Sequence, residues 1–287
     1  MSRRPYFEGL YFKHQKGDQM LALIPGRADD GAFIQVLTPE RSYHIPFAAG
    51  QVSGQHAVIG ENSFSRQGIN LHIATDALCL TGSLSYRGQH PLRSDIMGPF
   101  RYLPMECRHQ VVSMDHEVAG RLCLNGKIID FTGGRGYIEG DRGRSFPRSY
   151  TWLQCNSFRF SCSVMVSLAE IPLGPAHFWG CIAALILDGV EYRLSTYQGV
   201  RILCHSPERI ELQQGRYRLC ATLPAGTGHI LRAPAAGVMT RRIRERPSCP
   251  VHIRFSIGGK EIFNEISLFA SFEHTAPDMT RLAGEYK

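Results

Sequence analysis

The chain has 287 residues, a length that allows about two domains. Hydrophobic residues make up 43% and charged residues 20%, which is typical of a globular protein and excludes intrinsic disorder as its main state. The net charge of +7 comes from arginine, but no nucleic-acid-binding motif accompanies it, so a nucleic-acid partner is not expected.

No apolar segment typical of a signal peptide follows the N-terminus, Met-Ser-Arg-Arg-Pro-Tyr-Phe-Glu. The most apolar window, residues 178–187, is too short to span a bilayer. Nine scattered cysteines without a C-x-x-C pair argue against a disulfide framework and against a zinc site. We therefore expect a cytoplasmic protein whose arginines allow, at most, a peripheral contact with anionic membranes.

Alternating apolar and polar residues predict strands over 69–73, 78–86 and 158–164. Three dipeptides between apolar runs predict tight hairpins, because they tolerate positive φ angles: Asn125-Gly126, Asp188-Gly189 and Gly258-Gly259. Helical periodicity is weak throughout. The pattern predicts an all-β protein built of antiparallel barrels or sandwiches. From the lengths, we expect two domains, residues 1–147 and 148–287.

Two segments interrupt the strand pattern. Residues 86–107 are rich in proline and lack periodicity, and long loops of this kind in compact domains are often functional. Residues 132–148 are rich in glycine and arginine, and we expect a second irregular segment there.

The most unusual stretch of the sequence carries two carboxylates, Glu139 and Asp141, close to several arginines. In the strand expected after it, Trp152, Gln154 and Asn156 fall on one face because side chains alternate. An aromatic ring beside two amides suits a binding pocket. The alternative is a buried structural network in which the carboxylates pair with the neighbouring arginines.

Other chemical motifs are absent. The sequence contains no G-x-S-x-G, no H-E-x-x-H and no dinucleotide-binding glycine motif. Its twelve histidines show no paired ligand spacing. The sequence therefore predicts neither a metal nor another cofactor.

Three segments, in order, resemble the tocopherol cyclase-like family. The opening motif Y-F-E-G-W-Y-F-K is similar to residues 6–13, and the late L-x-A-P motif is similar to residues 231–234. Leu10 and Arg142 stand where the family motifs have tryptophan. The central motifs Y-x-E-K-x-W-G-x-x-F-P and W-x-W-x-Q-C-N are matched at Tyr137, Glu139, Gly143, Phe146, Pro147, Trp152, Gln154, Cys155 and Asn156.

The resemblance implies two lipocalin-like β-barrel domains packed side by side, as in related carotenoid hydratases and some Diels–Alder cyclases. It also implies an activity like that of the plant members, which close the chromanol ring of tocopherols from phytyl quinols. Such a cyclase, of the intramolecular lyase or isomerase type, needs no redox cofactor. An acid protonates the alkene, and the phenol oxygen captures the tertiary cation.

This interpretation requires a carboxyl group that burial keeps protonated in a water-poor pocket. The candidates are Glu139, Asp141 and Glu8. The expected ligand is a hydrophobic isoprenoid or a quinol-type molecule, held in one pocket between the two halves. The substrate-binding residues are expected to be Tyr11, Tyr137, Phe146, Trp152, Gln154 and Asn156.

Two other functions fit the same sequence. The protein could be a non-catalytic, lipocalin-like carrier of a hydrophobic ligand. It could also be an enzyme of another type, such as a hydratase or a pericyclic cyclase. A protonated carboxyl group in the pocket favours acid chemistry, whereas an apolar pocket without one favours the carrier.

Overall fold

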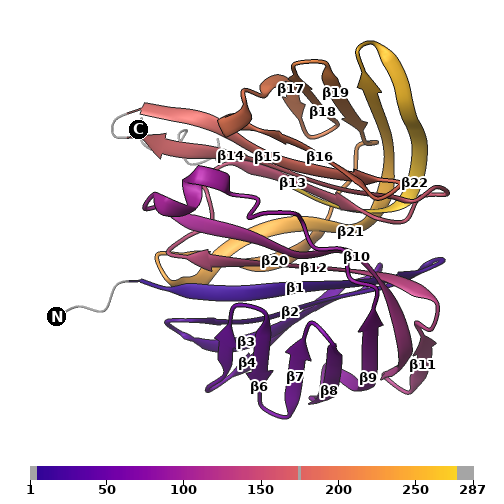
Figure 1. Cartoon of the computed structure of the whole chain (residues 1–287). Coiled ribbons are helices and arrows are strands. Elements are labelled where there is room, and N and C mark those ends of the chain that lie inside the picture. The colour runs from indigo at the N-terminus through magenta and orange to yellow at the C-terminus, as the bar shows by residue number, and fades with distance from the viewer. Residues whose placement is uncertain (1–4, 174–175, 277–287) are drawn as a thin grey trace.

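The computed structural model describes residues 5–173 and 176–276, which form two large antiparallel sheets and two short 3-10 helices. The first half of the chain forms the lower sheet in Figure 1 and the second half forms the upper one. The predicted all-β class with two barrel- or sandwich-like halves is therefore confirmed. None of the helices in the described part of the chain has the length and apolar character needed to cross a membrane.

The first sheet has twelve strands in the spatial order β4-β3-β2-β1-β12-β10-β9-β8-β7-β6-β5, with β11 beside β10. Its strands are β1 (Phe7–Lys16), β2 (Gln19–Ala28), β3 (Gly31–Leu37), β4 (Ser42–Phe47), β5 (Gln51–Ser53), β6 (His56–Ile59), β7 (Asn62–Ser65), β8 (Gly68–Ala74), β9 (Cys79–Arg87), β10 (Cys107–Leu124), β11 (Lys127–Asp130) and β12 (Gly134–Gly143). The 3-10 helix η1 (Gly98–Tyr102) lies between β9 and β10.

The second sheet has ten strands in the order β16-β15-β14-β13-β22-β21-β19-β18-β17, with β20 beside β21. Its strands are β13 (Tyr150–Cys155), β14 (Cys162–Leu173), β15 (Ala176–Leu187), β16 (Val190–Ser195), β17 (Arg201–Ser206), β18 (Arg209–Gln214), β19 (Tyr217–Thr222), β20 (His229–Ala235), β21 (Val238–Ile257) and β22 (Lys260–Thr275). The helix η2 (Thr196–Gln198) follows β16. The chain passes between the sheets over residues 144–149, where the proposed domain boundary lies.

The three predicted hairpin turns are confirmed. Asn125-Gly126 joins β10 to β11, Asp188-Gly189 joins β15 to β16, and Gly258-Gly259 joins β21 to β22. All six residues have positive φ, between 47° and 84°, as expected of the turns that match the twist of paired strands. The alternation at 69–73 is also confirmed, since alternate residues of β8 are buried.

Two predicted segments differ from the structure. The strand expected over 158–164 begins only at Cys162, so its first four residues lie outside it. The irregular segment expected over 132–148 is instead largely β12, which lies centrally in the first sheet between β1 and β10. Glycines in this strand make room for large neighbours: a Cβ at Gly136 would lie 2.2 Å from Nε2 of His116.

Buried side chains form three clusters. One fills the concave side of the first sheet, and one fills that of the second sheet. The third cluster packs the two sheets against each other, and it contains Tyr11, Tyr137, Tyr150, Trp152 and Ile243. The hairpin β20–β21 extends over the first sheet, as Figure 1 shows, and the Arg232 amide donates to Gln35 Oε1 there. The layer between the sheets is the part of the fold that positions the site.

Candidate active site

A cavity of about 160 Å³ lies in the layer between the two sheets. A cavity of about 150 Å³ accommodates benzene, so this one has room for a single ring. An apolar cavity with a few polar groups is the usual form of a small-molecule site. The aromatic residues in its wall are Phe7, Tyr11, Phe33, Phe100, Phe146, Tyr150 and Trp152, and its acidic or basic residues are His109, Glu139, Asp141, Arg232 and Glu273.

The central polar feature is an imidazole between two carboxylates. His109 on β10 lies directly opposite Asp141 on β12, and its Nδ1 is 3.1 Å from Asp141 Oδ1. Its Nε2 is 3.3 Å from Glu139 Oε2. Burial alone would disfavour the imidazolium, but the two carboxylates outweigh it and raise the pKa of His109 well above the ordinary value. The alternative, in which these carboxylates pair with the neighbouring arginines, is not what the structure has: Arg142 is exposed, and Arg144 lies 3.7 Å from Glu106.

Glu139 receives donors from both sheets. Tyr137, two residues away on the same face of β12, donates its hydroxyl to Glu139 Oε2 at 2.5 Å. Trp152 on β13 donates its indole Nε1 to the same oxygen at 3.0 Å. The Tyr11 ring meets the Trp152 ring edge-on at 5.2 Å, and this contact fixes the indole from the side of β1. The carboxylate is therefore held rigidly at the cavity wall.

A different carboxyl group lines the cavity in a more apolar setting. Glu273 on β22 is buried, and Tyr150 donates its hydroxyl to Glu273 Oε2. Burial, followed by the nearby Glu245 carboxylate, raises the pKa of Glu273 well above the ordinary value, although the Tyr150 hydrogen bond opposes this shift. Such an environment favours the protonated, neutral form of the carboxyl group.

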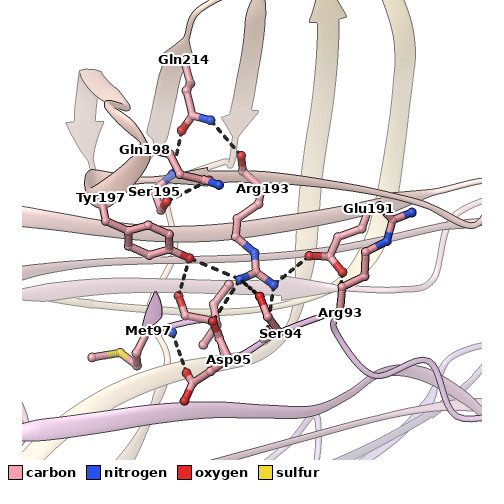
Figure 2. Close-up of polar contacts among 11 residues, drawn as sticks. Arg93, Ser94, Asp95, Met97, Glu191, Arg193, Ser195, Tyr197, Gln198 and Gln214 are labelled. Atoms are coloured by element: carbon pink, nitrogen blue, oxygen red, sulfur yellow. Dashed lines mark hydrogen bonds and ion pairs between the residues drawn. The ribbon is translucent and has the colours of Figure 1, made fainter. Parts of the chain in front are cut away.

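The long loop before β10 covers the cavity with Met97 and Phe100. Figure 2 shows how the second sheet fastens it: Arg193 on β16 donates Nη1 to Ser94 Oγ at 2.9 Å and to the Asp95 carbonyl oxygen at 3.0 Å. Glu191 Oε1 accepts a hydrogen bond from Nη2 of the same guanidinium at 2.7 Å. The expectation of an irregular segment over 86–107 is thus confirmed, apart from the short helix η1.

The structure brings together five of the predicted site residues. Tyr11, Glu139, Asp141, Phe146 and Trp152 all line the cavity between the sheets. They come from β1, β12, the segment joining the two sheets, and β13, so residues separated by more than a hundred positions meet at one site.

The other predicted residues lie elsewhere. Tyr137 is fully buried behind Glu139 and reaches the site only through its hydroxyl. Gln154 is fully buried further along β13, away from the cavity. Asn156 donates Nδ2 to Asp115 Oδ1 at 3.1 Å and to the Gly136 carbonyl oxygen at 2.9 Å, and it borders a separate open groove.

Glu8 points to the opposite face of β1 from Tyr11, because their side chains are separated by an odd number of positions. Its Oε1 accepts from the Gly54 amide at 2.9 Å, and its Oε2 accepts from the Tyr6 hydroxyl at 2.8 Å. These contacts make Glu8 a link between β1 and the loop that joins β5 to β6. It does not line the cavity between the sheets.

Sequence reasoning missed His109 and Glu273. His109 lies in an Arg-His-Gln stretch without motif character, and only the β10–β12 register brings it to Asp141. Glu273 had a weak signal, because a single carboxylate follows the mostly apolar segment Leu268-Phe269-Ala270-Ser271-Phe272. A charge at a position where alternation predicts burial marks a candidate functional residue.

His109, Glu139 and Asp141 also form a group whose ligand atoms lie within 4.8 Å of one another. Imidazole nitrogen and carboxylate oxygen are ordinary metal ligands. Here, Nδ1 of His109 already makes a hydrogen bond to Asp141 Oδ1, and Nε2 lies 3.3 Å from Glu139 Oε2, so a cation would compete with these contacts.

Comparison with known proteins agrees with these observations. Residues 84–171 match the family model described as tocopherol cyclase-like. This segment contains His109, Glu139, Asp141 and Trp152. No curated protein matches the sequence.

Solved structures share the fold over nearly the whole chain. CghA matches with a TM-score of 0.63 and 12% identity over 96% of this chain and 89% of its own. A protein assigned as AttH from Nitrosomonas europaea matches with a TM-score of 0.55 and 12% identity, over 96% of this chain and 93% of its own. Kievitone hydratase from Nectria haematococca matches with a TM-score of 0.55 and 8% identity, over 96% of this chain and 90% of its own. The predicted resemblance to the tocopherol cyclase-like family is therefore confirmed by the family match within residues 84–171. The two-sheet fold is shared with these solved structures over 96% of the chain.

Proposed function

We propose that the protein is an enzyme that protonates an alkene of a hydrophobic isoprenoid or quinol-type molecule, with Glu273 as the acid. The observation that carries this proposal is a buried carboxyl group with a raised pKa in the wall of an apolar cavity. An acid of this kind can transfer its proton near neutral pH. A carrier has no need of it, because burying such a group costs stability.

Glu273 suits the role of the acid better than the other polar groups of the cavity. His109 is also a possible proton donor, but its Nδ1 is hydrogen-bonded to Asp141 Oδ1 and its Nε2 lies 3.3 Å from Glu139 Oε2, so the two carboxylates hold its charged form in place. Glu139 accepts hydrogen bonds from Tyr137 and Trp152 and is held as an acceptor.

The remaining groups can stabilise the cation that protonation creates. Glu139, Asp141 and protonated His109 together carry one net negative charge beside an apolar cavity, where electrostatic interactions are stronger than in water. The faces of aromatic rings such as Trp152 and Tyr150 also attract cations. The site therefore offers an acid and a matched environment for a carbocation.

Two reactions follow from the same first step. In cyclisation, a hydroxyl oxygen of the substrate bonds to the cation and loses its proton, so the product is an isomer of the substrate. In hydration, a water molecule takes this place. The family match, described as tocopherol cyclase-like, supports cyclisation of a prenylated quinol, whose aromatic ring the cavity has room for. The shared fold with kievitone hydratase supports hydration as the second candidate.

The test begins with mass spectrometry of lipids that copurify from the native host, followed by incubation with a panel of prenylated hydroquinones and linear isoprenoid alkenes. We expect Glu273→Gln to abolish turnover and to keep ligand binding, because the amide has nearly the same shape. The matched control is Glu117→Gln, on the exposed side of β10. A product of unchanged mass indicates a cyclase, and a gain of one water indicates a hydratase. Full turnover by Glu273→Gln, or binding without any product by the unmodified protein, would overturn the proposal.

A further inference from the structure

A second group of buried polar residues lies behind the cavity wall, further along β1. Alternate residues of β1 face the second sheet: Tyr11 lines the cavity, Lys13 is fully buried, and Gln15 borders the open groove at the far end. Lys13 donates Nζ to the Phe269 carbonyl oxygen at 2.7 Å, and Phe269 is itself part of the groove wall. This face of β1 therefore runs from the cavity to the solvent-filled groove.

Glu245 on β21 is at the centre of this group and has no exposed surface. Its Oε1 accepts from the Tyr11 hydroxyl at 2.6 Å, and that hydroxyl also lies 3.1 Å from Ser271 Oγ. Its Oε2 has no hydrogen-bond partner among the described residues. Burial raises the pKa of Glu245 to about 7, although Tyr11 and Lys13 oppose the shift.

Gln154 adds two more unsatisfied atoms. It has no exposed surface, yet neither Oε1 nor Nε2 finds a partner in residues 5–173 or 176–276. Gln15 Oε1 is unsatisfied in the same way. Buried polar atoms in proteins are nearly always hydrogen-bonded, either to protein or to ordered water. Several such atoms along one face indicate internal water between the cavity wall and the groove.

Glu245 also lies directly opposite Glu273, because the two are paired across the β21–β22 ladder. Side chains directly opposite in an antiparallel pair have Cβ atoms about 4.5–5.5 Å apart. Two buried carboxyl groups at this distance resist ionising together, so the pair tends to keep a proton between them. The charged groups that face the pair are Lys13 from β1 and Glu139 and Asp141 from β12.

We propose that Glu245 is a proton relay for Glu273, and that water held among Lys13, Gln154 and Glu245 connects this carboxyl pair to the groove at the far end of β1. The relay rests on the proposed function, in which Glu273 is the acid. Glu245 does not line the cavity, so it acts through Glu273 and is a positioning residue.

The proton balance is simple. Glu273 gives its O–H proton to an alkene carbon and becomes a carboxylate. The proton of Glu245 then moves to Glu273, and Glu245 recovers one from the internal water, which exchanges with the groove. In a cyclisation, the substrate hydroxyl loses one proton to solvent when its oxygen bonds to the cation, and this proton replaces the one that the groove water supplies to Glu245, so no net proton is consumed.

The experiment uses the ligand-free full chain, and infrared spectroscopy follows the C=O stretch of protonated carboxyl groups as pH is varied. The charge of one carboxylate opposes ionisation of the other. We therefore expect Glu245→Gln, which removes one of the two charges, to move the titration of Glu273 to lower pH. An unchanged Glu273 titration in Glu245→Gln would overturn the proposed pair.

The water connection has its own readout. After transfer into D₂O, exchange of the Glu273 carboxyl proton should be slower in Gln154→Leu by about tenfold, equivalent to about 1.4 kcal/mol. Gln213→Leu, on β18 outside this layer, is the matched control. Unchanged exchange in Gln154→Leu would overturn the water route. Neither measurement needs a substrate, so the two proposals can be tested separately. If the relay is wrong, Glu273→Gln can still abolish turnover. If the proposed function is wrong, the carboxyl pair can still titrate as expected.

Discussion

Trp152 donates its indole Nε1 to Glu139 Oε2 at 3.0 Å, and this hydrogen bond joins the two sheets at the cavity wall. The bond crosses from β13 to β12, and the Tyr11 ring from β1 packs against the same indole. Packing of the two sheets and placement of the carboxylate therefore depend on the same contact. A change at Trp152 should affect the site before it affects the fold of either sheet.

Trp152→Phe tests this contact, because it keeps an aromatic ring and removes the N–H donor. A hydrogen bond to a charged group is worth about 1.5–3 kcal/mol, so we expect turnover or ligand affinity to fall by about one order of magnitude or more. The measurement is ligand binding together with the melting temperature. Trp179→Phe is the control, since Trp179 is the other tryptophan and is 40% exposed. Equal effects of the two changes would show that the donor has no special role.

The fold could be predicted from local patterns, whereas half of the site could not. The Asn125-Gly126 turn and the alternation in β8 depend only on neighbouring residues, so the sequence contains that information. The meeting of His109 with Asp141 depends on the β10–β12 register, which includes two irregularities, at residues 111–113 and 113–116. The apolar environment of Glu273 depends on how the second sheet packs on the first, and no local pattern records it.

Glycine content misled the prediction of β12. Glycine weakens an isolated strand, and for this reason residues 132–148 were expected to be irregular. In the fold, Gly136 lies against His116 and Gly140 lies against Leu10, at positions where a Cβ would come within 2.2 Å and 2.8 Å of those side chains. The glycines thus serve close packing at the centre of the sheet, which a single sequence does not distinguish from a loop.

His109→Gln should reduce stability in a pH-dependent way. The pKa of His109 is raised in the folded state, so the charged imidazole contributes stability that is fully present below about pH 6.5 and is lost as pH rises through the raised value. Breaking a buried ion pair costs about 3–5 kcal/mol. We expect the difference in the free energy of unfolding between wild type and variant to be largest at acidic pH and to shrink in alkali.

Urea unfolding at several pH values measures this difference. The other histidines contribute equally to the pH dependence of stability in wild type and variant, so their contributions cancel in the difference. His72→Gln is the matched control, because His72 is 63% exposed in its side chain and lies 3.7 Å from Glu61. A difference that does not change with pH would contradict the assignment of a charged His109.

Arg193→Ala should release the loop that covers the cavity. The change removes the donors to Ser94 and Asp95, and we expect faster amide hydrogen exchange over residues 93–102, by about tenfold for a loss of about 1.4 kcal/mol. A looser loop should also admit ligands longer than one ring. The control is Arg121→Ala, which breaks an exposed ion pair with Asp130. If Arg193→Ala lowers global stability but does not speed amide exchange over residues 93–102, Arg193 does not hold the loop in place.

Ala169→Phe should block the cavity while keeping the fold. Ala169 lies opposite Tyr150 in the β13–β14 ladder and lines the cavity, so a phenyl ring there enters empty space. A cavity of about 150 Å³ holds one benzene ring, so a phenyl group in this cavity of about 160 Å³ leaves little room for a ligand. Because the added ring fills a void, we expect the free energy of unfolding to fall by less than the roughly 1–3 kcal/mol of an overpacked core.

Mass spectrometry should find the copurified lipid lost from Ala169→Phe and retained by Ala119→Phe, on β10 away from the cavity. Retention of the lipid by both variants, with unchanged melting temperatures, would place the ligand site outside the layer between the sheets.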